Sequence, residues 1–275
     1  MKPAAEIREK IESLSAIPTL PTVLTNLLAV IDSEGTSIKH IGDLINKDQA
    51  LSTRLLKMVN SPVYGFPGRI SSVHQALMLV GLGALKGMLM GVAIFDAMQK
   101  TMIGLWEHSI GSAIAARLIA VKVGMKETEE ASVAALIHDL GKVTFGICYP
   151  DEYKALLGKA KTEEQYIVDV ERENFGVNHA EAGRWIAKKW NFPGNLVEAI
   201  AYHHKPELAK DAGELAAIVH LSDMIIKMIG FGFSGDPYVH QVNSKAWELL
   251  GLDGEDLKDV LSELEDAVSG ESLSL

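Results

Sequence analysis

Histidine and aspartate residues of the kind that hold divalent metals recur through the second half of the chain. They stand in the order His108, His138 with Asp139, His179, His203 with His204, and Asp223. Each lies in or beside an apolar stretch with helical periodicity rather than in a polar loop. Neutral imidazoles and carboxylates are ligands that Fe, Mn, Zn and Ni accept, and helical bundles direct such groups inward from several helices. The sequence therefore predicts a site for one or two divalent metal ions.

The two doublets in this series constrain how such a site could be built. Neighbouring residues on a helix diverge by about 100°, so His138 and Asp139 cannot point in one direction. A doublet can flank one ion or reach toward two neighbouring ions, and an aspartate is a natural bridging ligand between two metals. Burying unpaired carboxylates would cost several kcal/mol. Either a cation or a dense hydrogen-bond network must therefore accompany them.

The order of these residues resembles a known superfamily. The pattern His…His-Asp…Asp, with the doublet inside HDLGK, is similar to that of the HD metal-dependent phosphohydrolases. The resemblance implies that His108, His138, Asp139 and Asp223 bind one metal. It also implies a catalytic role for Asp139 as a bridging ligand.

Further residues extend the resemblance to a particular group of HD enzymes. His179, His203 and His204 match the extra histidines of HD-GYP enzymes, which bind two or more metals and hydrolyse cyclic di-GMP. The chain continues as KPELAKDAGELAA where those enzymes carry their GYP loop, which argues against that substrate. Lys142 matches the lysine that faces the substrate phosphate, a catalytic role. Without the resemblance, Lys142 could equally cap the C-terminus of a helix beside Gly141.

The first half of the chain resembles a narrower family. Leu20-Pro21, INKDQALSTRLLKMVNSPVYG, ISSVHQALMLVGLGALKGM and LWEHSIGSAIAARLIA are similar to segments of HDOD proteins, over roughly residues 14–225. HDOD proteins are all-helical bacterial signalling modules, often without demonstrated enzymatic activity, and many have lost the metal ligands. This chain keeps them. The resemblance thus implies a signal-transduction module with a metal centre that binds a signalling protein or a small phosphorylated ligand.

Two functions fit this sequence. In one, the protein is an output or scaffold module whose metal is structural or sensory. In the other, it is a metal-dependent phosphohydrolase acting on a nucleotide or cyclic nucleotide, in which metal-bound water is the nucleophile and His203 or His204 protonates the leaving oxygen. A metal site that opens on a pocket favours catalysis, whereas a sealed and coordinatively closed site favours the structural role.

Composition excludes several other classes of protein. With 26 basic and 36 acidic residues and a net charge of −10, the surface repels phosphate backbones, so no nucleic-acid partner is expected. Cys148 is the single cysteine, and the start MKPAAEIREKIESL is charged and amphipathic rather than a signal peptide. The apolar stretch 76–95 contains Lys86 and several glycines, which predicts two short buried helices around a glycine turn. We expect a cytoplasmic protein without a membrane span.

The elements that must position the site are predicted to be helices throughout. Apolar stripes at 23–31, 38–45 and 52–59 precede a loop at 64–69. Later helices are predicted near 105–123, 128–138, 151–158, 163–173, 178–190, 195–203, 211–229, 242–250 and 254–268. The fold class is therefore all-α, with an N-terminal helical bundle over 1–103 packed against an HD-like bundle over 104–275. His40, His74, His220 and His240 are interpreted as core or interface histidines, with a supporting role beside the metal left open for His220.

Overall fold

The protein was studied as a computed structural model that describes residues 3–14, 27, 30, 31, 33, 35–66 and 68–269. Within these residues there are helices and no strands, which confirms the predicted all-α class. The helix predicted over 23–31 lies outside the described residues, apart from Leu27, Val30 and Ile31. The helices of the first part are α1 (Ala4–Ser13), α3 (Ile38–Asn46), α4 (Gln49–Val59) and α5 (Val73–Thr101).

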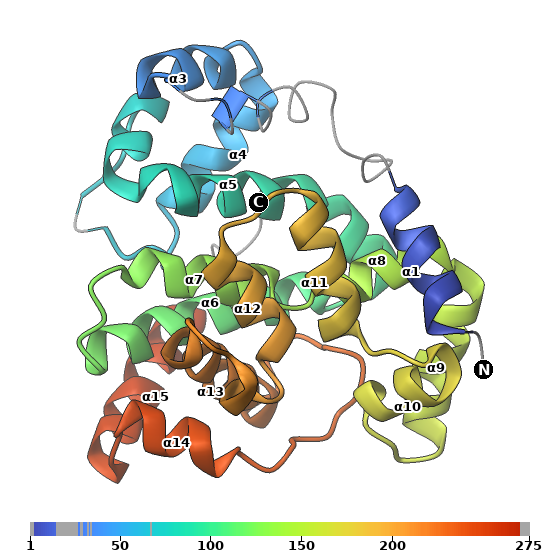
Figure 1. The fold of residues 1–275 in the computed structure, drawn as a ribbon. Helices are drawn as coiled ribbons and strands as arrows, with labels where there is room; N and C mark the ends of the chain where they lie inside the picture. The colour runs from blue at the N-terminus through green and yellow to red at the C-terminus, as the bar shows by residue number, and fades with distance from the viewer. Residues whose placement is uncertain are drawn as a thin grey trace.

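Polar side chains begin three of these helices. Ser37, Asp48 and Ser72 each accept a hydrogen bond from a backbone N–H in the first turn, of α3, α4 and α5 respectively. Such caps satisfy donors that have no partner within the helix. Figure 1 shows α3 and α4 at one end of the molecule, with α5 running between them and the remaining helices.

The apolar stretch around Gly81 is bent rather than continuous. Gly81 has φ 76° and ψ 168°, a conformation that glycine adopts without the steric penalty of a Cβ, and the helical pieces on the two sides of the break lie at 114°. The prediction of two short helices around a glycine turn is confirmed. Burial holds for the second piece, whereas Met78 and Leu79 in the first are exposed.

The second part of the chain consists of eleven further helical segments among the described residues. These are α6 (Leu105–Lys122), α7 (Thr128–Ile137), α8 (Leu140–Cys148), α9 (Pro150–Thr162), α10 (Ile167–Phe175), α11 (His179–Lys189), α12 (Gly194–Tyr202), the short 3₁₀ helix η1 (Pro206–Leu208), α13 (Gly213–Ile229), α14 (Ser244–Leu250) and α15 (Gly254–Val268). α6 packs against α7, α13 and α15, and it is buried on nearly all its faces. A helix that is apolar all round is expected in such a central position.

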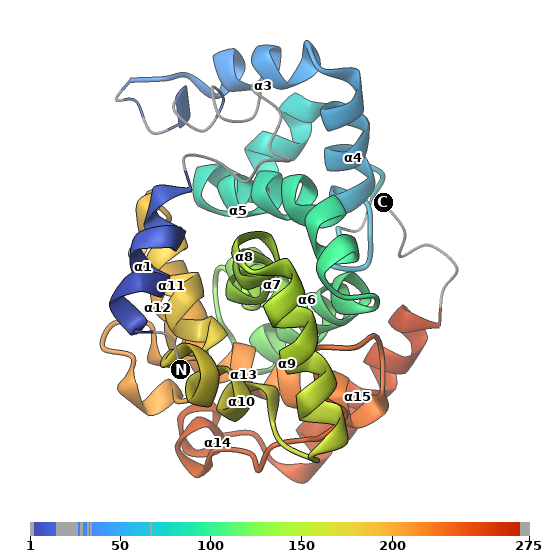
Figure 2. The same ribbon diagram turned by 90° about the vertical axis from the view of Figure 1, so that its right-hand side faces the viewer.

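Helices of the first part pack directly against helices of the second part. α5 packs against α6, α7 and α8, while α1 lies on α11 and α8 (Figure 2). The boundary predicted at 100–104 coincides with the break between α5 and α6, where Gly104 is left-handed. The division into two bundles at 103/104 remains a prediction, since buried side chains form one cluster across that break.

One segment, 128–148, is long and apolar enough to cross a membrane by length and composition. In this structure 89% of its most apolar window is buried inside the protein. The segment is two helices, α7 and α8, separated by His138 and Asp139. Its burial is consistent with a core element of a soluble protein.

Candidate metal centre

Three residues from three helices form the first group of facing ligand atoms. His108 lies on α6, His138 follows the last residue of α7, and Asp223 lies on α13. The Nε2 atom of His108 is 3.0 Å from Oδ1 of Asp223, and that of His138 is 3.8 Å from the same oxygen. One ligand atom from each of the three side chains lies within 4.8 Å of the others, so one ion could lie among them.

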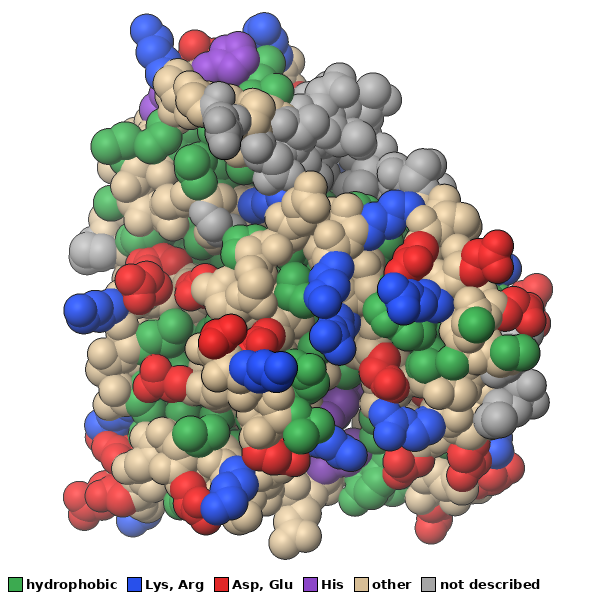
Figure 3. Space-filling model, viewed as in Figure 1, with side chains coloured by type: hydrophobic (Ala, Val, Ile, Leu, Met, Phe, Trp, Pro, Cys, Tyr) green, Lys and Arg blue, Asp and Glu red, His purple; other side chains and the backbone are tan. Residues whose placement is uncertain are grey.

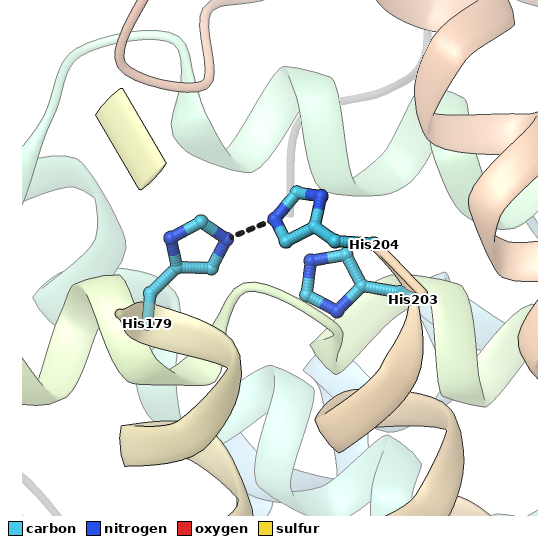
Figure 4. Close-up of side chains that lie close together, drawn as sticks. All are labelled: His179, His203 and His204. Atoms are coloured by element: carbon cyan, nitrogen blue, oxygen red, sulfur yellow. Dashed lines mark hydrogen bonds between the residues drawn. The ribbon is translucent and has the colours of Figure 1, made fainter. Parts of the chain in front are cut away.

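A second group consists of three histidines, shown in Figure 4. His179 begins α11, and His203 and His204 directly follow α12. The Nε2 atoms of His179 and His204 are 2.8 Å apart. One ligand atom from each of the three histidines lies within 4.8 Å of the others. The three rings thus converge on one point from two helix ends.

Asp139 lies between the two groups. Its Oδ2 atom is 3.3 Å from Nε2 of His138 and 4.0 Å from Nε2 of His108, while its Oδ1 atom is 3.4 Å from Nε2 of His179. The two oxygens of one carboxylate therefore face different groups, which is the geometry of a bridging ligand. The structure brings all seven residues named from the sequence into this double cluster.

Buried ligand atoms without hydrogen-bond partners provide a test of whether a metal fits. Five such atoms converge here: Nε2 of His108, His138 and His203, and Oδ1 of Asp139 and Asp223. Nε2 of His108 and Oδ1 of Asp223 face each other at 3.0 Å, so a proton on that nitrogen would pair these two atoms, while each buried polar atom left unsatisfied costs about 1–3 kcal/mol. A divalent cation would satisfy these atoms together, and the set of imidazoles and carboxylates fits Fe, Mn, Zn or Ni.

The remaining ring nitrogens fix which atom of each histidine is free. Nδ1 of His138 donates to the carbonyl of Ala135 at 2.6 Å, and Nδ1 of His203 donates to that of Ile200 at 2.8 Å. A carbonyl can only accept, so Nδ1 carries a proton in both rings, and Nε2 presents a lone pair when the ring is neutral. Burial lowers the pKa of His138, but the carboxylates of Asp139 and Asp223 outweigh it and raise that pKa above its ordinary value, so a metal would have to displace a proton from Nε2 of this ring. Burial also holds the pKa of His203 well below its ordinary value, which keeps this imidazole neutral as a metal ligand requires.

Two lysines next to the carboxylates shape the electrostatics of the site. Lys142, in the first turn of α8, donates to Oδ2 of Asp139 at 2.7 Å, and Lys227 on α13 donates to Oδ2 of Asp223 at 3.2 Å. Burial raises the pKa of Asp139, but the charges of His138 and Lys142 outweigh it and hold that pKa well below the ordinary value. Lys142 therefore contacts a ligand directly, and it lies at the start of a helix rather than at a C-terminus. Its role toward a phosphate remains a prediction.

Glu171 was not anticipated from the sequence. Its carboxylate is fully buried and accepts from Nδ1 of His179 at 2.6 Å, from the backbone N–H of His179 at 2.8 Å and from the hydroxyl of Tyr153 at 2.8 Å. This hydrogen bond leaves Nε2 of His179 for the second group and raises its basicity as a ligand. No local spacing signals the pair, because Glu171 and His179 meet across the turn between α10 and α11. Lys227, by contrast, follows Asp223 by four residues. This spacing places two side chains on the same face of a helix, so the sequence could have indicated their ion pair.

The other histidines divide into four cases. His220 donates from Nδ1 to the carbonyl of His203 and accepts at Nε2 from the N–H of Asn243, so it supports the backbone beside a ligand. His74, on α5, is half-buried against α3, with Nε2 3.3 Å from the carbonyl of Lys39 and 3.4 Å from the carboxylate of Asp43. His40, by contrast, is exposed and is not a core residue. His240 lies against Tyr166, with 3.9 Å between ring centroids, and 5.7 Å from the ring of His204. Neither ring nitrogen of His240 has a hydrogen-bond partner.

A cleft of about 480 Å³ opens beside the second group. His204 forms part of its wall, whereas His108, His138, Asp139 and Asp223 lie deeper and are at most 1% exposed. Figure 3 shows histidine side chains in a hollow with Lys and Arg side chains beside it. Of the seven candidate ligands, His204 alone lines this cleft, and the other six are buried behind it.

Comparison with known proteins gives a consistent result. The HDOD domain matches residues 17–206. An uncharacterized protein of Treponema pallidum (strain Nichols) is 29% identical over 236 residues, which cover 83% of this chain and 45% of that protein, so this chain spans less than half the length of that relative. An HDOD domain protein of unknown function from Geobacter sulfurreducens has a similar structure, with a TM-score of 0.74, 27% identity, and coverage of 99% of this chain and 98% of the other.

A further similar structure is that of a candidate metal-dependent phosphohydrolase from Shewanella amazonensis SB2B. Its TM-score is 0.66 at 18% identity, with 98% of each chain covered, and this likeness concerns the fold. The match of the HDOD domain, by contrast, covers most of the chain and includes six of the seven candidate ligand residues, all except Asp223. The chain belongs to the HDOD family.

Proposed function

We propose that this HDOD protein is a signal-transduction module that holds one or two divalent metal ions, of Fe, Mn, Zn or Ni, in the double cluster around Asp139. The observation that carries the proposal is the convergence of buried imidazole and carboxylate atoms in groups whose members lie within 4.8 Å of one another, with ring nitrogens such as Nε2 of His203 that have no hydrogen-bond partner among the residues that the structure describes. Lys142 and Lys227 offset part of the negative charge of Asp139 and Asp223, and Glu171 orients His179. In this proposal the protein is cytoplasmic and acts through a signalling protein that binds to it.

Hydrolysis of a phosphate ester is the second candidate function, and the cleft beside His204 favours it. When bound, a divalent metal would supply a water of lowered pKa and polarise a phosphoryl oxygen. Asp139 would hold the two ligand groups in register, since its oxygens face both. His204, at the wall of the cleft, is placed to exchange a proton with a leaving oxygen.

The test is the metal content of the full chain, purified without a histidine tag and measured by elemental analysis. We expect one or two equivalents in the unaltered protein and almost none in the double variant His138→Ala/Asp139→Ala. His204→Ala removes one ligand of the second group and should reduce the content to about one equivalent. His40→Ala, which removes an exposed histidine, is the matched control and should leave the metal content unchanged.

Circular dichroism of each variant checks that a loss of metal does not reflect unfolding. Full metal content in the folded double variant would refute the ligand assignment. A phosphodiesterase assay with bis(p-nitrophenyl) phosphate, run on the loaded protein and on the double variant, then separates the two candidate functions. Turnover that disappears in the double variant supports hydrolysis, and no turnover in the loaded protein supports the signalling role alone.

A further inference from the structure

The cleft beside His204 has a wall of unusual charge for so acidic a protein. The net charge of the chain is −10, yet the residues that line the cleft include three cations, Arg172, Arg184 and Lys205, against two carboxylates, Asp169 and Glu181. Its volume of about 480 Å³ is within the range of small-molecule sites, roughly 300–1,000 Å³. Its base leads to the second histidine group. The candidate metal ligands do not account for the size of this cleft or for the cations that line it.

Two of these cations are available to a ligand. Arg172 is already paired with Glu181 at 2.9 Å. Arg184 and Lys205, by contrast, have no carboxylate within ion-pair distance in the part of the chain that the structure describes. The guanidinium of Arg184 lies 5.8 Å from the centre of the Tyr202 ring, and the backbone N–H of Lys205 donates to the carbonyl of Tyr202. Both residues thus lie next to Tyr202 and line the cleft, with the guanidinium of Arg184 against that ring and Lys205 exposed.

Aromatic side chains also line the cleft. Tyr166 and His240 line the cleft and lie against each other, and His240 in turn lies beside His204. Both nitrogens of His240 lack a hydrogen-bond partner, and leaving buried polar atoms unsatisfied costs about 1–3 kcal/mol. This histidine lies beyond residue 206, where the match to the HDOD domain ends. The cleft therefore combines residues inside the matched range with a wall from the segment that follows it.

We propose that this cleft binds a small phosphomonoester that carries a flat ring, with its phosphate between Arg184 and Lys205 and its ring against Tyr166 and His240. Paired cations match the charge of a phosphate, and arginine can contact two of its oxygens at once. The proposal rests on the proposed function for placing this ligand beside bound metal. It does not require that the ligand be hydrolysed.

The test is calorimetric titration of the full chain, stripped with chelator and then also reloaded with Mn²⁺, with phenyl phosphate and with adenosine 5′-monophosphate. Phenol and adenosine, which lack the phosphate, serve as matched probes. We expect each phosphorylated probe to bind at least tenfold more tightly than its partner. Arg184→Gln and Lys205→Gln should each weaken that binding about tenfold, equivalent to about 1.4 kcal/mol.

Lys188→Gln is the matched control, because Lys188 is exposed on the same helix as Arg184 and does not line this cleft. Equal losses in Lys188→Gln and Arg184→Gln would mean a general charge effect and would overturn the proposal. So would equal affinity for phosphorylated and unphosphorylated probes. If either of these outcomes is found in protein that contains one or two equivalents of metal, the cleft proposal is wrong and the metal-centre proposal is unaffected. Binding that depends on Arg184 in a protein that never takes up metal would instead refute the proposed function.

Discussion

At the scale of single residues, the centre depends on which atom of each side chain is free. Carbonyl groups fix the protons of His138 and His203 on Nδ1, and a buried carboxylate does so for His179. Each ring then presents Nε2 to the cluster without further rearrangement. Preorganisation of this kind explains why Glu171, which itself contacts no other ligand residue in the double cluster, is fully buried beside it.

Glu171→Gln should weaken metal binding by about 10–100-fold, because the neutral amide supports the His179 ring less strongly than a carboxylate does. The affinity can be measured by competition with a chromophoric chelator. Tyr153→Phe is the control, since it removes a hydrogen bond to the same carboxylate and leaves the Glu171–His179 contact in place. That variant should lose about 1 kcal/mol of stability with little change in metal affinity. Wild-type affinity in Glu171→Gln would show that His179 is not held in this way.

At the scale of elements, the close contact of α8 with α11 brings Asp139 and His179 together. A Cβ at Gly141 would lie 1.8 Å from the carbonyl oxygen of His179 and 2.8 Å from the backbone nitrogen of Gly183. Neither neighbour is the end of a flexible side chain, so the two helices could not keep their separation. Gly141 is therefore required by a close approach of backbones rather than by a turn.

Gly141→Ala should destabilise the protein by about 2 kcal/mol or more, despite the better helix propensity of alanine, because α8 and α11 must separate. Denaturant unfolding measures the change, and metal content should fall with it as His179 moves. Gly158→Ala on α9 is the matched control, as a Cβ there meets no atom within 4 Å, and it should be neutral or stabilising by up to about 1 kcal/mol. Similar effects of the two substitutions would contradict the close-approach argument.

At the scale of the whole molecule, the candidate ligands join α6, α11, α12, α13 and the turn between α7 and α8, whereas α3 and α4 supply none. A metal that binds the folded state stabilises it by an amount that grows with its concentration relative to Kd. That stabilisation should be largest in the helices that carry the candidate ligands. By contrast, α3 and α4 pack on each other and on α5, so the effect on them would pass through α5.

Chelation should therefore lower the protection of amide hydrogens against exchange in α6, α12 and α13, and leave α3 and α4 nearly unchanged. At a free metal concentration about a hundredfold above Kd, the loss would amount to about 2.7 kcal/mol. Hydrogen–deuterium exchange with mass spectrometry resolves the two regions. The double variant His138→Ala/Asp139→Ala, measured in the same way, should not respond to chelator. A uniform response across α3 and α13 would count against a localised centre.

Periodicity in the sequence predicted most of the helices, and the helices that were missed or misplaced have local causes. The helices predicted near 105–123, 211–229 and 254–268 match α6, α13 and α15 closely. No helix was predicted over 140–148, because its glycines, Val143 and Thr144 have low helix propensity, and α8 forms where α5, α9 and α11 pack around it. The start of α10 was predicted four residues early, since Glu164 adopts a left-handed φ of 53° that ends the preceding turn.

By itself, the sequence determined the all-α class and the chemical identity of the seven candidate ligands, because helical periodicity and residue type are local properties. Only the tertiary structure decided that Asp139 faces both groups, that Glu171 supports His179, and that a cleft with Arg184 and Lys205 leads to His204. The physical reason is that these relations join residues on different helices. Their distances depend on how side chains of several helices pack, and no spacing along the chain encodes them.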